Sequence, residues 1–238
     1  MEWGLDGDII LYSVGFASQD DPVEFALKST RTACSNIMYD LGASRLHIYL
    51  TGAGNYRGAI VDDYKANRRD TDKPTHYKAI KQYMIDTLGA ILVEGEEADD
   101  AMGYGATLHG HGIATLDKDL DGVPGLHYNW KKRSLYYVSP EDADRFFYTQ
   151  LITGDSTDNI PGLFKRTGVK AMAKTKEPIE YMDDPKEMYA YVKQVYVDAV
   201  AKKGMSSDDT DITRWLLTQG QLLWIRRAEG ESWEAPCQ

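Results

Sequence analysis

The sequence predicts an α/β fold with a mainly parallel sheet flanked by helices, followed by a helical region. Two observations carry this prediction. Up to about residue 141, short apolar runs alternate with segments of helical periodicity, which is typical of βαβ units. Beyond that point, apolar residues recur at helical spacing. We therefore expect two domains, a core over residues 1–150 and a helical region over residues 151–238.

Each element is predicted from its apolar pattern and its end signals. The expected strands are the apolar runs at residues 2–6, 46–50, 90–93 and 112–116. One expected helix begins near Ile9, and three more cover residues 23–41, 75–88 and 97–109. Residues 126–130 and 134–138 flank a basic triplet and predict a hairpin with Trp130 at its turn. Apolar stripes over 188–200 and 215–223 predict packed helices.

The composition of the 238 residues is that of a globular protein, with 42% hydrophobic and 27% charged side chains. Two distant cysteines, Cys34 and Cys237, predict neither a disulfide framework nor a metal site. We expect no membrane helix and no signal peptide, and hence a cytoplasmic protein. The net charge of −10 on its own argues against nucleic acid, but the acids and bases are segregated along the chain.

Acidic side chains recur where the predicted strands end. Those that follow strands are Asp6, Glu97, Asp99, Asp100, Asp117 and Asp119, and two more, Asp155 and Asp158, open a turn after a helix. In an open parallel sheet, ligands bind outside the carboxyl ends of the strands, so we expect the groups that follow strands to converge. A lone aspartate at the start of a helix is usually a cap. The recurrence after successive strands is what favours a metal site.

The chemistry of these ligands indicates which ions they bind. Clustered carboxylates raise one another's pKa, and a divalent cation relieves their repulsion. Oxygen ligands without histidine or cysteine select Mg²⁺, with Mn²⁺ as a substitute, over Zn²⁺. Two or more such ions stabilise the attacking and leaving oxygens when a phosphodiester is hydrolysed.

Two basic segments complement the acids. They are residues 64–69 with Lys73, Lys78 and Lys81, and residues 165–176 with Lys165, Arg166, Lys170, Lys174 and Lys176. Each such run taken alone is usually a solvated helix face, but beside an acidic metal site the two fit the binding of a phosphate backbone. The segment 159–170 contains glycines at intervals and predicts a tight hairpin. Its backbone amides would bind phosphates without recognising the bases.

Five motifs occur together in a familiar order. They are Leu5-Asp6-Gly7-Asp8, Tyr64-Lys65-Ala66-Asn67-Arg68, Glu97-Ala98-Asp99-Asp100, Asp117-Lys118-Asp119-Leu120, and Gly154-Asp155-Ser156-Thr157-Asp158-Asn159-Ile160-Pro161-Gly162. The set resembles the flap endonuclease and 5′→3′ exonuclease family, which includes the 5′-nuclease domain of bacterial DNA polymerase I. The length of the chain resembles that of the stand-alone bacteriophage enzymes of this family. The resemblance covers roughly residues 3–170.

The resemblance implies a PIN-like 5′-nuclease core followed by a helix-hairpin-helix-like DNA clamp. It matches all eight acids to metal positions, and it matches Lys65 and Arg68 to a catalytic basic pair at the scissile phosphate. It makes Tyr64 a residue that stacks on a terminal base. The full expected set of DNA-binding residues is Arg57, Tyr64, Lys65, Arg68, Arg69, Lys165, Arg166 and Lys170.

The implied activity is Mg²⁺-dependent hydrolysis of DNA at duplex ends, 5′ flaps and nicks, leaving 5′-phosphates. RNA primers on DNA are further expected substrates. We expect a monomer that serves phage-type DNA replication or the degradation of host DNA. It would act in the host cytoplasm, with replication proteins as partners.

The sequence departs from the family pattern in three places. The second strand ends in Thr51 without an acid, and we expect Asp8 to compensate. The stretch between Lys65 and Glu97 is short for a long helical arch, and the hairpin lacks a second Gly-x-Gly.

Three other interpretations remain open. A non-catalytic protein that binds branched DNA is one, and the missing acid at Thr51 is its only support. A HAD-type phosphatase would use Asp6 and Asp8 as its Asp-x-Asp motif but leaves the other motifs unexplained. A PIN-type RNase shares the acidic core and would lack the hairpin and the helical extension.

Overall fold

The computed structural model describes residues 1–68, 71–206 and 208–236, and it divides into two compact units. The first unit comprises residues 1–56, 71–138 and 225–230. The second comprises the described parts of 57–70, 139–224 and 231–238. This division differs from the predicted boundary at residue 150, because each unit is built from segments that are far apart in the sequence.

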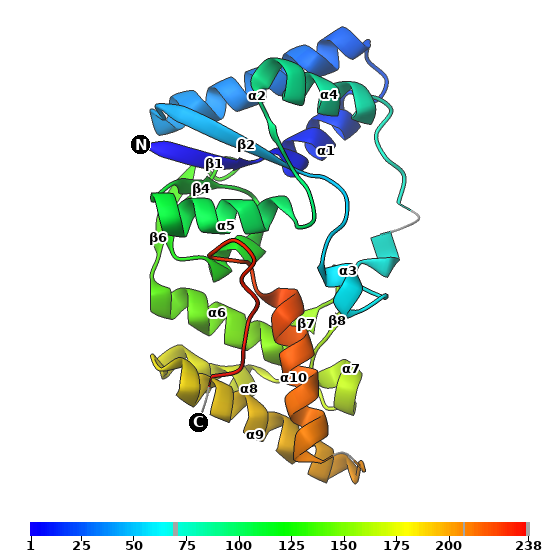
Figure 1. Cartoon of the computed structure of the whole chain (residues 1–238), viewed down its shortest axis with the longest axis vertical. Coiled ribbons are helices and arrows are strands. Elements are labelled where there is room, and N and C mark those ends of the chain that lie inside the picture. The colour runs from blue at the N-terminus through cyan, green and yellow to red at the C-terminus, as the bar shows by residue number, and fades with distance from the viewer. Residues whose placement is uncertain (69–70, 207, 237–238) are drawn as a thin grey trace. The chain divides into compact units, whose positions relative to one another are not determined.

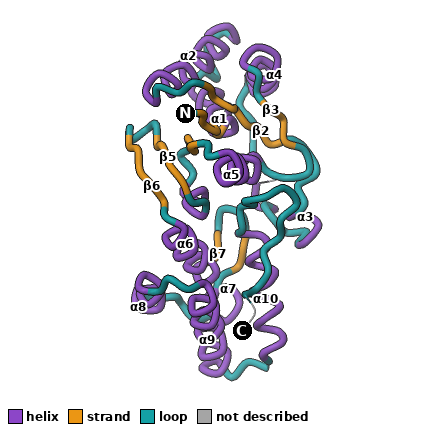
Figure 2. Tube along the Cα trace, turned by 60° about the vertical axis from the view of Figure 1, so that its left-hand side comes forward, coloured by secondary structure: helices purple, strands orange, loops and turns teal. Residues whose placement is uncertain are grey.

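A six-stranded sheet forms the centre of the first unit (Figure 1). Its strands are β1 (Glu2–Asp6), β2 (Arg45–Thr51), β3 (Ile91–Val93), β4 (Gly112–Ala114), β5 (Gly125–Asn129) and β6 (Ser134–Val138). Their order is β3-β2-β1-β4-β5-β6, and only the β5–β6 pair is antiparallel. The predicted mainly parallel sheet and the predicted hairpin, visible in Figure 2, are therefore confirmed.

Helices cover both faces of this sheet. Helices α1 (Gly7–Ala17), α2 (Val23–Leu41) and α4 (Tyr77–Leu88) pack on one face, and α5 (Ala98–His109) packs on the other. The alternation of side chains along a strand decides which face each residue meets. Trp3 and Leu5 of β1 join the core under α1, α2 and α4, so Glu2, Gly4 and Asp6 face α5.

The second unit is mostly helical. Its elements are α3 (Arg57–Ile60), η1 (Ala66–Arg68), α6 (Pro140–Thr153), β7 (Gly154–Asp155), β8 (Ile160–Pro161), α7 (Leu163–Thr167), α8 (Ala173–Lys176), η3 (Glu177–Tyr181), α9 (Pro185–Lys203) and α10 (Asp209–Leu223). Helices α6, α9 and α10 share one core, in which Leu151, Tyr196 and Leu216 are fully buried. This shared core explains why α6 belongs with the second unit and not with the sheet.

The two-residue strands β7 and β8 form a ladder that the sequence pattern did not predict. Gly154 permits the ladder, because its φ of 67° favours glycine and its α-carbon lies directly against the backbone of Gly162. Within the described part of the chain, no helix has the length and apolar character needed to cross a bilayer.

Candidate active site

Asp6 lies at the carboxyl end of the central strand and also caps α1. Its Oδ1 accepts a hydrogen bond from the Ile9 amide at 3.1 Å, and its Oδ2 accepts one from the Thr115 hydroxyl at 2.9 Å. The side chain is buried, and burial raises the pKa of Asp6 to about 7, with the charges of Asp8 and Asp117 adding to the effect. Asp6 therefore lies within electrostatic reach of two further carboxylates.

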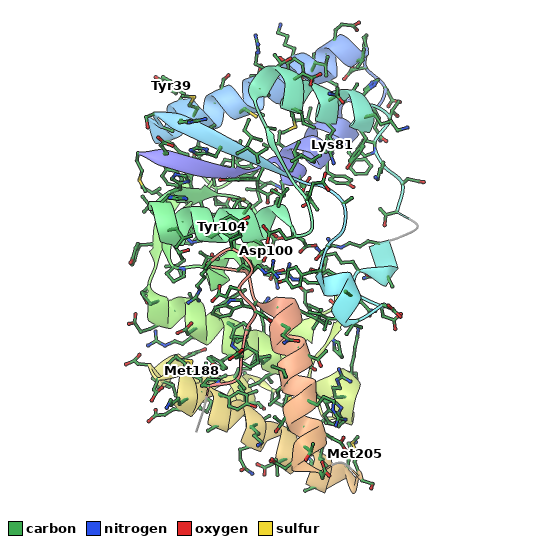
Figure 3. All side chains as sticks on the ribbon, viewed as in Figure 1. Tyr39, Lys81, Asp100, Tyr104, Met188 and Met205 are labelled. Carbon is green, nitrogen blue, oxygen red and sulfur yellow. The ribbon has the colours of Figure 1, made fainter. Side chains whose placement is uncertain are left out.

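Asp8 places a carboxylate at the end of β2, where the sequence has no acid of its own. Its Oδ2 accepts a hydrogen bond from the Thr51 amide at 3.0 Å. Burial raises the pKa of Asp8, the Thr51 hydrogen bonds and the charge of Lys81 lower it, and the charge of Glu97 raises it. Lys81, labelled on α4 in Figure 3, donates to the Thr51 carbonyl at 3.0 Å. The structure thus places the Asp8 carboxylate beside the end of β2, and its role as a substitute ligand stays a prediction.

Glu97 and Asp100 open α5 as a capping box. Glu97 Oε1 accepts a hydrogen bond from the Asn55 amide group at 2.8 Å. Both oxygens of Asp100 accept main-chain hydrogen bonds, from Glu97 at 3.2 Å and from Arg226 at 3.0 Å. Asp100, labelled in Figure 3, is fully buried, so in this structure its carboxylate holds the start of α5 and the segment 225–230 together. Asp99 is half-buried in the same first turn.

Asp117 follows β4 and connects to Asp6 through Thr115. The Asp117 amide donates to the Thr115 hydroxyl oxygen at 2.9 Å, and this hydroxyl in turn donates to Asp6. Asp117 Oδ1 accepts from the Asp119 amide at 2.9 Å, which starts the 3₁₀ helix η2 (Lys118–Gly122). Sequence reasoning missed Thr115, because a threonine near the end of a buried strand is ordinary in a sheet.

The remaining two predicted ligands, Asp155 and Asp158, lie in the second unit. Asp155 is buried, and its Oδ1 accepts from the Thr157 amide at 2.7 Å. Asp158 Oδ1 lies 2.7 Å from Arg68, and its Oδ2 lies 3.4 Å from Lys65 Nζ. The structure therefore brings Asp158 together with the predicted basic pair.

Tyr64 and Arg57 were predicted to contact DNA, but the structure buries both side chains in the packing of the second unit. Tyr64 packs in a cluster with Ile160 and Leu222. The Arg57 guanidinium donates to the carbonyls of Leu222 at 2.9 Å and Trp224 at 2.6 Å, where α10 ends. These contacts give both residues a structural role.

The other predicted DNA-binding residues differ in exposure. Lys165 and Lys170 are exposed. Arg166 is half-buried, with its guanidinium 5.6 Å from the centre of the Trp215 ring. Arg69 lies outside the described residues.

The raised pKa of Asp6 makes stability depend on pH in a defined direction. Its folded pKa of about 7 exceeds the ordinary 3.8, so the folded state holds a proton that the unfolded state releases. This contribution is complete below pH 4 and is lost as the pH rises through 7. Without metal, we expect D6N to be about as stable as the wild type at pH 4 and more stable at pH 8 by about 4 kcal/mol. Urea unfolding in chelator at both pH values measures this, and equal pH slopes for the two proteins would contradict it.

The parallel sheet with carboxylates after its central strands defines a PIN-like 5′-nuclease fold, and solved structures of 5′-nucleases share it. A bacteriophage T5 5′-exonuclease with bound zinc has a TM-score of 0.54 and 16% identity over 92% of this chain and 100% of that one. The T5 D15 flap endonuclease with DNA and metal ions gives 0.52 and 16% over 92% and 99%. The catalytic core of Rad2 with a DNA substrate gives 0.57 and 12% over 99% and 83%. No protein-family model and no curated protein matches the chain.

Proposed function

We propose that this protein is a divalent-metal-dependent nuclease that hydrolyses DNA at 5′ ends, flaps or nicks. The proposal rests on the placement of four carboxylates at the carboxyl ends of neighbouring parallel strands. Asp6 ends β1, Asp8 accepts a hydrogen bond from Thr51 at the end of β2, Glu97 precedes α5 after β3, and Asp117 follows β4. The shared fold supports the proposal, because structures with this fold include metal-bound and DNA-bound nucleases.

The residues of this site fit a hard divalent cation. Four carboxylates offer oxygen ligands alone, and burial, with a smaller contribution from neighbouring carboxylates, raises the pKa of Asp6 and Asp8, which a bound cation would offset. Asp6, Asp8, Glu97 and Asp117 would hold Mg²⁺ or Mn²⁺, with Asp99 and Asp119 of the same unit as additional ligands. When bound, such ions lower the pKa of a water molecule and stabilise charge on the phosphate. We propose that Asp100 and Asp158 position other groups instead.

The protein's own cations would hold the scissile phosphate. Lys65 and Arg68 both pair with one carboxylate, Asp158, which fixes the positions of the two side chains. The Lys65 amide also donates to the Asp158 carbonyl at 3.0 Å, so the backbone around the pair is fixed too. The exposed Lys165 and Lys170 would bind the backbone further along the DNA. The proposed role is phage-type DNA replication or degradation of host DNA. The products would carry 5′-phosphates, and RNA primers would be among the substrates.

We expect K65A to slow the cleavage step by about 100-fold, because the variant removes a charge-assisted contact to the phosphate. Single-turnover cleavage at saturating protein measures this rate directly. K78A is the matched control, since Lys78 is an exposed lysine of the same basic segment. An unchanged single-turnover rate in K65A would remove Lys65 from the reaction.

The proposal is tested by cleavage of labelled DNA. A nicked duplex, a 5′-flap, a 3′-flap and an RNA–DNA hybrid are each incubated with Mg²⁺, with Mn²⁺ and with chelator. We expect short 5′-phosphorylated products from the 5′-flap and the nick, only with metal, and no cleavage of the 3′-flap. Binding without cleavage in either metal would instead favour a non-catalytic protein that recognises branched DNA.

A further inference from the structure

Two histidines and a glutamate meet at the amino end of the sheet, on the face that α5 covers. Glu2 opens β1, His47 lies in β2 and His111 comes directly before β4. The strand register explains the meeting, because His47 pairs with Gly4 and Gly112 pairs with Trp3, which places His111 beside Glu2. All three residues belong to the first unit.

The side chains approach within coordinating distance of one common point. His47 Nε2 lies 2.5 Å from Glu2 Oε2, and His111 Nε2 lies 3.8 Å from the same oxygen. The two imidazole rings stack with their centres 4.5 Å apart and their planes 11° apart. One ligand atom from each residue lies within 4.8 Å of the other two.

One glycine of α5 makes room for this arrangement. Gly105 of α5 lies over His111, and a β-carbon at Gly105 would come within 3.3 Å of His111 Nδ1. The helix can therefore lie close to the sheet without displacing the imidazole.

We propose that Glu2, His47 and His111 form a binding site for a transition-metal ion of the Zn²⁺ type, separate from the carboxylate site. Two imidazoles and one carboxylate are ligands that suit Zn²⁺, Co²⁺, Ni²⁺ or Cu²⁺ and disfavour Mg²⁺. Tetrahedral Zn²⁺ holds its ligand atoms about 3.3 Å apart, given Zn–N bonds of roughly 2.0–2.1 Å. A small rotation of Glu2 would bring the measured 2.5 Å and 3.8 Å to that spacing.

Solvent can reach this site and complete the coordination. The Glu2 side chain is 44% exposed, whereas His47 and His111 are 13% and 14% exposed. The imidazoles are thus held by packing, and the carboxylate is free to adjust. The competing interpretation is a structural ion pair between His47 and Glu2 with a stacked His111, which would bind no ion.

The site is distinct from the one proposed for catalysis. Glu2 and Asp6 lie on the same face at opposite ends of β1, and four residues of strand span about 13 Å. Binding of Zn²⁺ by Glu2, His47 and His111 therefore does not require nuclease activity.

The test is titration of the metal-free protein with Zn²⁺ in excess Mg²⁺, followed by calorimetry, with Co²⁺ absorption as a spectroscopic readout. We expect one Zn²⁺ site in the wild type and in D117N. H47A and H111A should bind at least about 100-fold more weakly. H109A is the matched control, because the His109 ring lies 5.5 Å from that of His111 but outside the three-residue cluster.

Fold integrity is checked by the melting temperature of each variant in chelator, and E2Q provides a variant that keeps the shape of the third ligand. Loss of the Co²⁺ absorption in E2Q, with an unchanged melting temperature, would support the site. Equal Zn²⁺ affinity in H47A, H111A and the wild type would overturn it, as would loss of all Zn²⁺ binding in D117N.

Discussion

The variant D117N is expected to lose DNA cleavage by at least about 1000-fold while it keeps its affinity for DNA. Asparagine can still accept the hydrogen bond from the Asp119 amide, so η2 should form as before. The negative charge beside Asp6 is lost, and with it a ligand for an ion that stabilises several kcal/mol of charge in the transition state. Single-turnover cleavage of a 5′-flap and fluorescence anisotropy in Ca²⁺ measure the two properties.

The matched control is D121N. Asp121 is a nearby aspartate of η2, and its Oδ1 accepts a hydrogen bond from the Tyr136 hydroxyl at 2.7 Å. D121N removes the same charge a few residues away and should cleave at the wild-type rate. If D117N lost cleavage and DNA affinity by the same factor, Asp117 would act in DNA binding and its role as a metal ligand would be excluded.

The variant W233A is expected to destabilise the second unit by about 4 kcal/mol. The buried indole packs on Gly220 of α10 and lies 5.3 Å from the Phe147 ring and 6.1 Å from the Tyr189 ring. Truncation would leave a cavity between α6, α9 and α10. Thermal unfolding should show a fall of about 10 °C in the melting temperature.

E234A is the control, because Glu234 is the exposed neighbour of Trp233 and should unfold as the wild type does. G220A tests the same contact from the other side, since a methyl group at Gly220 would overlap the indole. A wild-type melting temperature for W233A would show that the segment after residue 230 does not contribute to stability.

Most of the fold could be predicted from local patterns. The helix over 23–41 and the hairpin strand 134–138 were predicted with the bounds observed, because their periodicity and end signals agree. The β7–β8 ladder was not predicted, since two-residue strands have no period. The division into units was beyond prediction too, because the packing of α6 depends on helices far along the chain.

For the candidate site too, the sequence predicts what depends on local patterns and does not predict contacts between distant side chains. The order of the acids after strands predicted where Asp6 and Asp117 lie, because the ends of parallel strands share an edge. The Thr115 bridge and the pairing of Asp158 with Arg68 depend on side-chain geometry that spacing does not encode. Arg57 reaches carbonyls more than 160 residues away, so its burial could not be inferred from its own neighbourhood.

The interleaved course of the chain limits how this protein can be dissected. Each unit draws on three separate segments, and residues 225–230 return to the first unit before the chain ends in the second. No single truncation therefore yields either unit as a contiguous polypeptide. A proteolytic cut after residue 224 would remove the Arg226 amide that Asp100 binds and Trp233 as well, which weakens both units at once. We therefore expect neither unit to be completed during synthesis until residues 225–233 have left the ribosome, because Ile225–Gly230 belong to the first unit and Trp233 to the core of the second.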